Sequence, residues 1–219
     1  MNLAPLNYNF GNASNYSFAT TITCNNEDAR KMFVEGFGHM LNYNHEQAIA
    51  CYMNVTELDP TCAMAWWGIA YCVSSNYNWT PGLGSGYDPI QQAISLKAGC
   101  TALEQDLIDA LAERHSEEAR DAADPSVLNM GNSPELNIAF AKAMAPLYLK
   151  YKGNLDVAAI YVEALMNLNA WQLWNKNTET GEITPLDNNT LLCVKVMEDA
   201  FENISGAKQH IALCHLYCH

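Results

Sequence analysis

The stretch NHEQAIACYMNVTELDPTCAMAWWGIAY, residues 44–71, decides the fold of this chain. It holds two helix-like segments separated by Asp59-Pro60, and a proline cannot continue a preceding helix. The sequence therefore predicts one helix that ends before Pro60 and another that begins directly after it. Upstream, a helix is predicted from an N-cap at Asn26 to about Leu41, with a turn before the next helix.

The spacing of small and aromatic residues fits a tetratricopeptide repeat (TPR), whose period is about 34 residues. Gly36 and Ala48 are the small residues that let two helices cross closely, and Tyr52 is the aromatic side chain beside them. Pro60 closes the repeat and Trp66 opens the next. The predicted fold is therefore all-α, a TPR-like α-solenoid of antiparallel helix hairpins.

The remaining sequence continues the helical pattern without any alternation long enough to predict a sheet. A second clear hairpin is predicted over residues 133–171, and further helices over 89–99, 101–119 and 186–203. Residues 1–24 are rich in polar residues and tyrosine without a helical period, so they are interpreted as an extended N-terminal arm. Residues 25–219 form the predicted repeat domain, with a Gly/Pro-rich loop inserted at residues 76–89.

Three segments resemble a family of large TPR proteins known mostly from bacterial sequences. The segments are residues 44–78, which contain DPTCAMAWWGIA, EALMNLNAWQLW at 163–174, and HIALCHLYCH at 210–219. The likeness extends over residues 18–219. It implies the helical-repeat fold, no particular activity, and a histidine at position 45.

This chain departs from the family pattern at Ile211-Ala212, where the family has Pro-Gly, so the local turn is expected to differ. Family members continue with more repeats and more histidine motifs. The resemblance therefore implies that this chain corresponds to the N-terminal portion of such a protein.

The net charge of −13 argues against two classes of partner. An acidic surface repels the phosphate backbone of nucleic acids and anionic membrane surfaces. No apolar run reaches the roughly 18 residues of a membrane span. Protein partners, especially basic ones, remain the favoured class.

Cysteines and glycosylation sequons point to different compartments. The eight cysteines lie mostly among apolar helix-like residues, which favours buried free thiols over disulfides and slightly favours the cytoplasm. Six Asn-x-Ser/Thr sequons would permit a secreted glycoprotein instead. The asparagines of these sequons are Asn12, Asn15, Asn54, Asn78, Asn188 and Asn203.

The closing HIALCHLYCH carries the candidate metal ligands. His215 and His219 are four residues apart, so on a helix both imidazoles project from one face and could hold Zn²⁺, Cu²⁺ or Fe²⁺. His210 and His45 are the proposed further ligands, provided that the solenoid brings the early helix to the late one. The pattern is not the HExxH motif of metalloproteases, because Leu216 stands where that motif has its general-base glutamate. The alternative is a structural role, in which the two histidines at the end of a helix interact favourably with the helix dipole and bind no metal.

Four aromatic residues are candidates for contact with a partner: Trp67, Tyr77, Trp79 and Tyr87. Trp66 and Trp67 are adjacent, so only one points squarely inward, and Trp66 is expected to be the packing residue. The stretch ERHSEE at residues 113–118 is interpreted as solvated and carries no assigned function.

Two function classes follow. The first is a repeat scaffold that binds a protein or peptide, including a second copy of itself, through the surfaces that stacked helix pairs expose. The second is a metal-dependent enzyme or metal-binding protein with histidines on several helices. The sequence names no catalytic residue or substrate for the second class.

Overall fold

The computed structural model describes residues 18–79, 81–127 and 130–219, and their architecture is helical. Within these residues it contains ten α-helices and one two-stranded sheet, which agrees with the predicted all-α class. The helices are α1 (Glu27–Leu41), α2 (His45–Leu58), α3 (Ala63–Val73), α4 (Tyr87–Leu96), α5 (Ala102–Ala112), α6 (Glu117–Asp121), α7 (Pro134–Lys150), α8 (Leu155–Met166), α9 (Asn188–Asn203) and α10 (Ile211–Leu216).

The predicted hairpin forms from α1 and α2, and α3 packs against α2. Asn26 caps α1, since its side chain accepts hydrogen bonds from Asp28 N and Ala29 N. The ring of Tyr52 fills the space between two glycines. A Cβ at Gly68 would lie 2.5 Å from that ring, and one at Gly36 would lie 3.0 Å from it. These glycines therefore permit the close approach of α1, α2 and α3.

The predicted arm falls mostly outside the described residues, and its last part packs against the domain. Residues 1–17 are not described, whereas Ala19–Thr21 form a 3-10 turn. The Phe18 ring is buried, with its centroid 5.7 Å from that of Phe37 and 6.1 Å from that of Trp67. The Phe18 backbone N donates to Asp156 Oδ2 at 2.9 Å. Residues 18–24 thus belong to the core, because an aromatic side chain anchors them there.

The loop between α3 and α4 folds back onto α3. Leu83 N and Gly84 N both donate to Val73 O, at 2.7 and 3.0 Å. Helix α5 then begins at a capping box formed by Thr101 and Glu104. Glu104 also accepts hydrogen bonds from Thr23 N and Oγ1, so it joins the N-terminal segment to α5.

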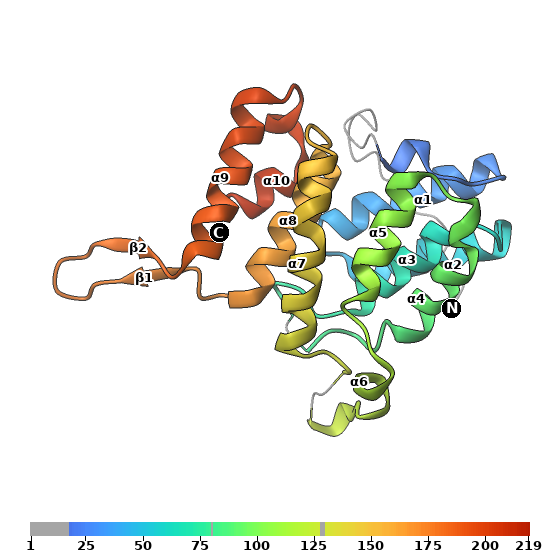
Figure 1. Cartoon of the computed structure of the whole chain (residues 1–219), viewed down its shortest axis with the longest axis horizontal. Helices are drawn as coiled ribbons and strands as arrows, with labels where there is room; N and C mark the ends of the chain where they lie inside the picture. Colours follow the sequence, from blue (N-terminus) through green and yellow to red (C-terminus); the bar gives the residue numbers. More distant parts are fainter. Residues whose placement is uncertain (1–17, 80, 128–129) are drawn as a thin grey trace.

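The second predicted hairpin forms from α7 and α8. Every residue of α8 is buried, and this helix packs against α7, α9 and α10. Figure 1 shows α7 and α8 between the α1–α5 half and the α9–α10 end of the molecule. Helix α8 therefore contacts segments that lie far from one another in the sequence.

One segment differs from the prediction. The sequence predicts no sheet, but residues 174–185, between two predicted helical segments, form an antiparallel hairpin of β1 (Trp174–Lys176) and β2 (Ile183–Pro185). The hairpin projects from the helical body (Figure 1), and nearly all of its strand residues are exposed. An exposed two-stranded ribbon has no buried face, so the alternation that predicts a strand is absent.

No described helix has both the length and the apolar character needed to cross a membrane.

Candidate functional site

Tyr43 and Trp171 are the two described non-glycine residues with positive φ, at 61° and 63°. Tyr43 follows α1 in a Schellman motif, in which Asn44 N donates to His39 O at 2.9 Å. Trp171 is the third residue of a turn closed by Gln172 N donating to Asn169 O at 2.9 Å. Glycine is usual at both positions, and an L side chain there costs roughly 1–2 kcal/mol. Both strained residues are aromatic, and both belong to the cluster described next.

His45 lies at the start of α2, stacked against Tyr43 with ring centroids 5.7 Å apart. Its Nδ1 lies 3.0 Å from Cys72 O, a contact that requires Nδ1 to carry the proton. Its Nε2 is then an acceptor, and it is buried with no hydrogen-bond partner among the described residues. Burial lowers the pKa of His45, although the charge of Glu163 opposes that shift. His45 is therefore a neutral imidazole with an available lone pair.

His215 also contacts the Tyr43 ring, and His219 contacts His215. The Tyr43 and His215 centroids are 5.1 Å apart, and the His215 and His219 centroids are 5.4 Å apart. His219 also contacts Tyr77 at 4.7 Å and Trp171 at 5.7 Å between centroids. Burial and the neighbouring His215 lower the pKa of His219. Four separate parts of the chain therefore meet in one cluster of rings.

A network of buried ionisable groups lies within electrostatic reach of the ring cluster. The Arg114 guanidinium is buried, and its Nε donates to Asn137 Oδ1 at 3.0 Å while Nη2 donates to Ser75 O. Glu163 Oε2 accepts a hydrogen bond from Tyr71, and Glu163 Oε1 is buried without a partner among the described residues. Burial, followed by the charge of Glu163, raises the pKa of Tyr43 well above its usual value. Perturbed ionisable groups of this kind cluster at functional sites.

His210 has a different role from the other candidate ligands. It is fully buried, and its Nε2 lies 3.0 Å from Asp156 Oδ1. Its Nδ1 accepts from Leu213 N at 3.4 Å, so it also caps α10. The imidazole therefore joins α8 to α10 inside the core. It does not form a ligand group with His215 and His219 within the described residues.

Within the described residues, the ligating atoms of His45, His215 and His219 do not form a group of three within 4.8 Å of one another. The Tyr43 ring contacts both His45 and His215. The fold nevertheless brings Tyr43, in the turn before α2, close to α10, since the Tyr43 and His215 ring centroids are 5.1 Å apart. Among the described residues, one group brings three such atoms within 4.8 Å of one another, and it consists of Glu35, His39 and Cys51.

The candidate partner-binding aromatics are divided between core and surface. Trp67 is only 1% exposed, and its Nε1 donates to Leu107 O at 3.1 Å. Tyr77 is also buried, stacked on Trp171. Trp79 is 50% exposed, and Tyr87 is covered by the Arg120 guanidinium, 4.8 Å above its ring. Trp79 is thus the one of the four that is free to contact a partner directly.

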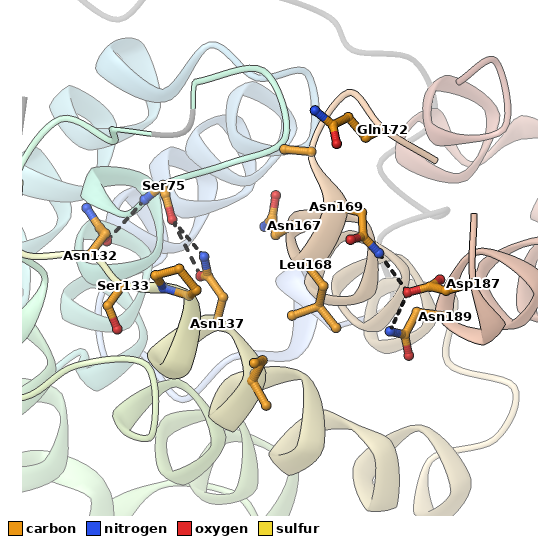
Figure 2. A pocket seen from close by; sticks show the side chains of 13 residues that line it. Ser75, Asn132, Ser133, Asn137, Asn167, Leu168, Asn169, Gln172, Asp187 and Asn189 are labelled. Atoms are coloured by element: carbon orange, nitrogen blue, oxygen red, sulfur yellow. Dashed lines mark hydrogen bonds between the residues drawn. The ribbon is translucent and has the colours of Figure 1, made fainter. Parts of the chain in front are cut away.

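A polar pocket of about 560 Å³ lies between α7, the 3-10 turn Asn167–Asn169 after α8, and the start of α9 (Figure 2). Asp187 in its wall accepts hydrogen bonds from Asn169 and Asn189, at 2.8 and 3.1 Å. Ser75 and Asn137 link this pocket to the buried Arg114. Its wall carries six side-chain amides, those of Asn132, Asn137, Asn167, Asn169, Gln172 and Asn189.

A second, more apolar groove of about 290 Å³ lies between β1, α9 and α10. Trp174 and Tyr217 form part of its lining and are 43% and 47% exposed.

Sequence reasoning missed Arg114, His115 and the pocket amides. The stretch ERHSEE reads as solvated, but Arg114 and His115 are both buried. Burial and the charge of Arg114 lower the pKa of His115 to about 3. The spacing could have indicated this burial. His115 continues the apolar i, i+4 series of Leu103, Leu107 and Leu111, and Arg114 lies three residues after Leu111. The pocket amides lie on three segments, so no local spacing brings them together.

The cysteines and sequons are placed as follows. All eight cysteines are free thiols, of which Cys214 and Cys218 are exposed. Asn12 and Asn15 lie outside the described residues. Asn78, Asn188 and Asn203 are exposed, whereas Asn54 is half-buried within α2.

Comparisons of this chain with protein-family models, with curated proteins and with solved structures find no match. Its function is therefore argued from its own residues.

Proposed function

We propose that this protein is a TPR-like repeat scaffold that binds an extended peptide in the amide-lined pocket. In this interpretation the helix pairs α1/α2, α3/α4, α7/α8 and α9/α10 are successive units of one α-solenoid. Residues 25–219 form that repeat domain, and the loop at residues 76–89 is an insertion within it. The pocket lies where two units meet, at the junction of α7, α8 and α9.

The observation that carries the proposal is the concentration of six side-chain amides in one pocket of about 560 Å³. Each primary amide both donates and accepts hydrogen bonds, as does each peptide unit of an extended chain. A pocket of this size falls within the range of small-ligand sites, roughly 300–1,000 Å³. A short peptide stretch could therefore exchange its hydrogen bonds with water for bonds to these amides.

Charge defines the preferred peptide. The protein carries a net charge of −13, and Asp187 is the carboxylate in the pocket wall. Complementary charge speeds association and selects among partners. The expected ligand is an extended peptide with lysine or arginine, and its binding should weaken as salt rises.

Selection from a phage-displayed random peptide library tests the proposal. The most enriched peptide would be synthesised and titrated by calorimetry into the parent protein and a Gln172→Ala/Asn189→Ala variant. The variant should bind at least tenfold more weakly, equivalent to about 1.4 kcal/mol. Asn203→Ala, an exposed asparagine at the far end of α9, is the matched control and should bind like the parent. No enrichment, or equal binding by the double variant, would refute the proposal.

Self-association belongs to the same proposal. Exposed Trp174 and Tyr217 border the apolar groove, and a second copy is the proposed occupant. Sedimentation velocity over a wide concentration range should show a dimer that is weakened by Trp174→Ser/Tyr217→Ser. A parent protein that stays monomeric throughout would rule this part out.

A second candidate function is binding of Zn²⁺, Cu²⁺ or Fe²⁺ by His215 and His219. Two observations favour it. The His215 imidazole on α10 adjoins that of His219, three residues beyond the end of this helix, and burial lowers the pKa of His219, which favours the neutral form that a metal ligand requires. His45 donates its Nδ1 proton to a backbone carbonyl, which is the usual support of a metal-binding histidine. His45 does not form a three-ligand group with this pair within the described residues.

Elemental analysis of the purified protein tests the metal candidate. The parent should retain metal, His215→Ala/His219→Ala should lose it, and Cys214→Ser/Cys218→Ser in the same C-terminal segment should keep it. Equal metal content in all three proteins, including none, would reject the histidine pair as the site. An enzyme built on this site should also lose its activity with the metal.

A further inference from the structure

The crossing of α1 and α2 holds a second, independent group of metal-ligand side chains. Glu35 and His39 are four residues apart on α1, so their side chains project from the same face. Cys51 lies opposite them on α2. A carboxylate oxygen, an imidazole nitrogen and the Cys51 Sγ all lie within 4.8 Å of one another.

The close approach of the helices places the thiol there. A Cβ on Gly36, the residue after Glu35, would lie 3.0 Å from Cys51 Cβ. A side chain at this position would require Cys51 and the Tyr52 ring to move by a few tenths of an ångström. Gly36 therefore both permits the helix crossing and assembles the three side chains.

The environment of Glu35 points to a cation. Its Oε1 is buried without a hydrogen-bond partner among the described residues. The described part of the chain places no lysine or arginine within ion-pair distance of it. A buried carboxylate without compensation is costly, and a bound cation would supply both charge and coordination.

We infer that Glu35, His39 and Cys51 form a zinc site. Thiolate, imidazole and carboxylate are the protein ligands that Zn²⁺ takes, at about 2.0–2.3 Å each. Around a tetrahedral ion, ligating atoms are roughly 3.3–3.8 Å apart, so small rotamer changes complete the site from the observed spacing. Binding releases the Cys51 proton and leaves a fourth position for water. Glu35 is half-buried, which gives that position a route to solvent.

Co²⁺ is the probe that distinguishes this site from the pair His215 and His219. It occupies zinc sites and gives a sulfur-to-metal charge-transfer absorption only when a thiolate is bound. The titration would use the full chain with Cys214→Ser/Cys218→Ser, which removes the two exposed thiols. We expect one equivalent of Co²⁺ to produce the thiolate absorption, and Zn²⁺ to abolish it.

Variants locate the signal. Cys51→Ser should lose the absorption, and Glu35→Gln, a milder change at a half-buried position, should weaken Co²⁺ binding at least tenfold. Cys100→Ser is the control, because this half-buried thiol lies outside the group, and it should leave the titration unchanged. Circular dichroism would check that each variant is folded. The inference is overturned if the parent gives no thiolate absorption, or if Cys51→Ser and Glu35→Gln titrate like the parent.

Discussion

Asp156 on α8 and His210 before α10 form a fully buried pair, with 3.0 Å between Asp156 Oδ1 and His210 Nε2. The other carboxylate oxygen of Asp156 accepts a hydrogen bond from Phe18 N at 2.9 Å. One side chain thus ties the N-terminal segment and the C-terminal helix to the centre of the fold. This explains why a histidine that resembles a metal ligand in the sequence has a structural role.

Asp156→Ala should destabilise the protein by about 3–5 kcal/mol, because it leaves His210 and the Phe18 N–H buried without their acceptor. Urea unfolding followed by circular dichroism measures the change. Glu57→Gln, on an exposed face of α2, is the control and should stay within about 0.5 kcal/mol. A loss below about 1 kcal/mol for Asp156→Ala would show that this pair is not a structural tie.

Trp171→Gly should be more stable than Trp171→Ala by about 1 kcal/mol, reversing the usual order of these residues. Both variants lose the ring contacts, but glycine alone relieves the strain of a φ of 63°. Ala170→Gly at the preceding position, where φ is −53°, is the matched comparison and should lose stability. Thermal unfolding of the three variants tests the prediction, which fails if alanine is the better residue at position 171.

Arg114→Met should cost about 3–5 kcal/mol, since it removes a buried charge that offsets Glu163 and leaves Ser75 O and Asn137 Oδ1 unpaired. Arg114→Lys keeps the charge but not the fork of donors, so an intermediate loss is expected. Adding Glu163→Gln to Arg114→Met should recover part of the loss, because no buried charge then lacks its partner. A double-mutant cycle of unfolding free energies without coupling would contradict this account.

The unfolding free energy should fall as the pH drops from about 6.5 towards 3. Burial and Arg114 lower the pKa of His115 to about 3 in the folded protein, whereas the unfolded chain has the ordinary histidine pKa of about 6.5. Between these two pH values the unfolded chain binds a proton at His115 and the folded chain does not. This contribution to stability is complete above pH 6.5 and is lost progressively below it, at up to about 1.4 kcal/mol per pH unit. His45 acts in the same direction.

Urea unfolding at pH 7.5, 6.0 and 5.0 tests the effect, with His115→Asn as the variant that does not titrate in this range. The variant should lose less stability between pH 7.5 and 5.0 than the parent. Identical slopes would assign the acid sensitivity to other groups.

The helices and the first hairpin could be predicted because their signals are local. Asn26 as N-cap, the Pro60 stop, and the spacing of Gly36 and Tyr52 all act within one or two turns of helix or across one crossing. The hairpin at residues 174–185 gave no such signal, since neither of its faces is buried. Local sequence signals thus determined the all-α class. They did not predict the β-hairpin, because an exposed hairpin needs no pattern of buried apolar residues.

By itself the sequence determined that Gly36 marks a close helix crossing and that the protein is strongly acidic. The prediction that His215 and His219 share a helical face was wrong, because α10 ends at Leu216 and His219 lies beyond it. Only the tertiary structure decided that the Tyr43 ring contacts both His45 and His215, that Asp156 pairs with His210, and that Arg114 is buried. It also decided which amides share a pocket. The reason is physical: periodicity fixes the direction of a side chain relative to its own helix, whereas its neighbours depend on how α8 packs against segments far away in the chain.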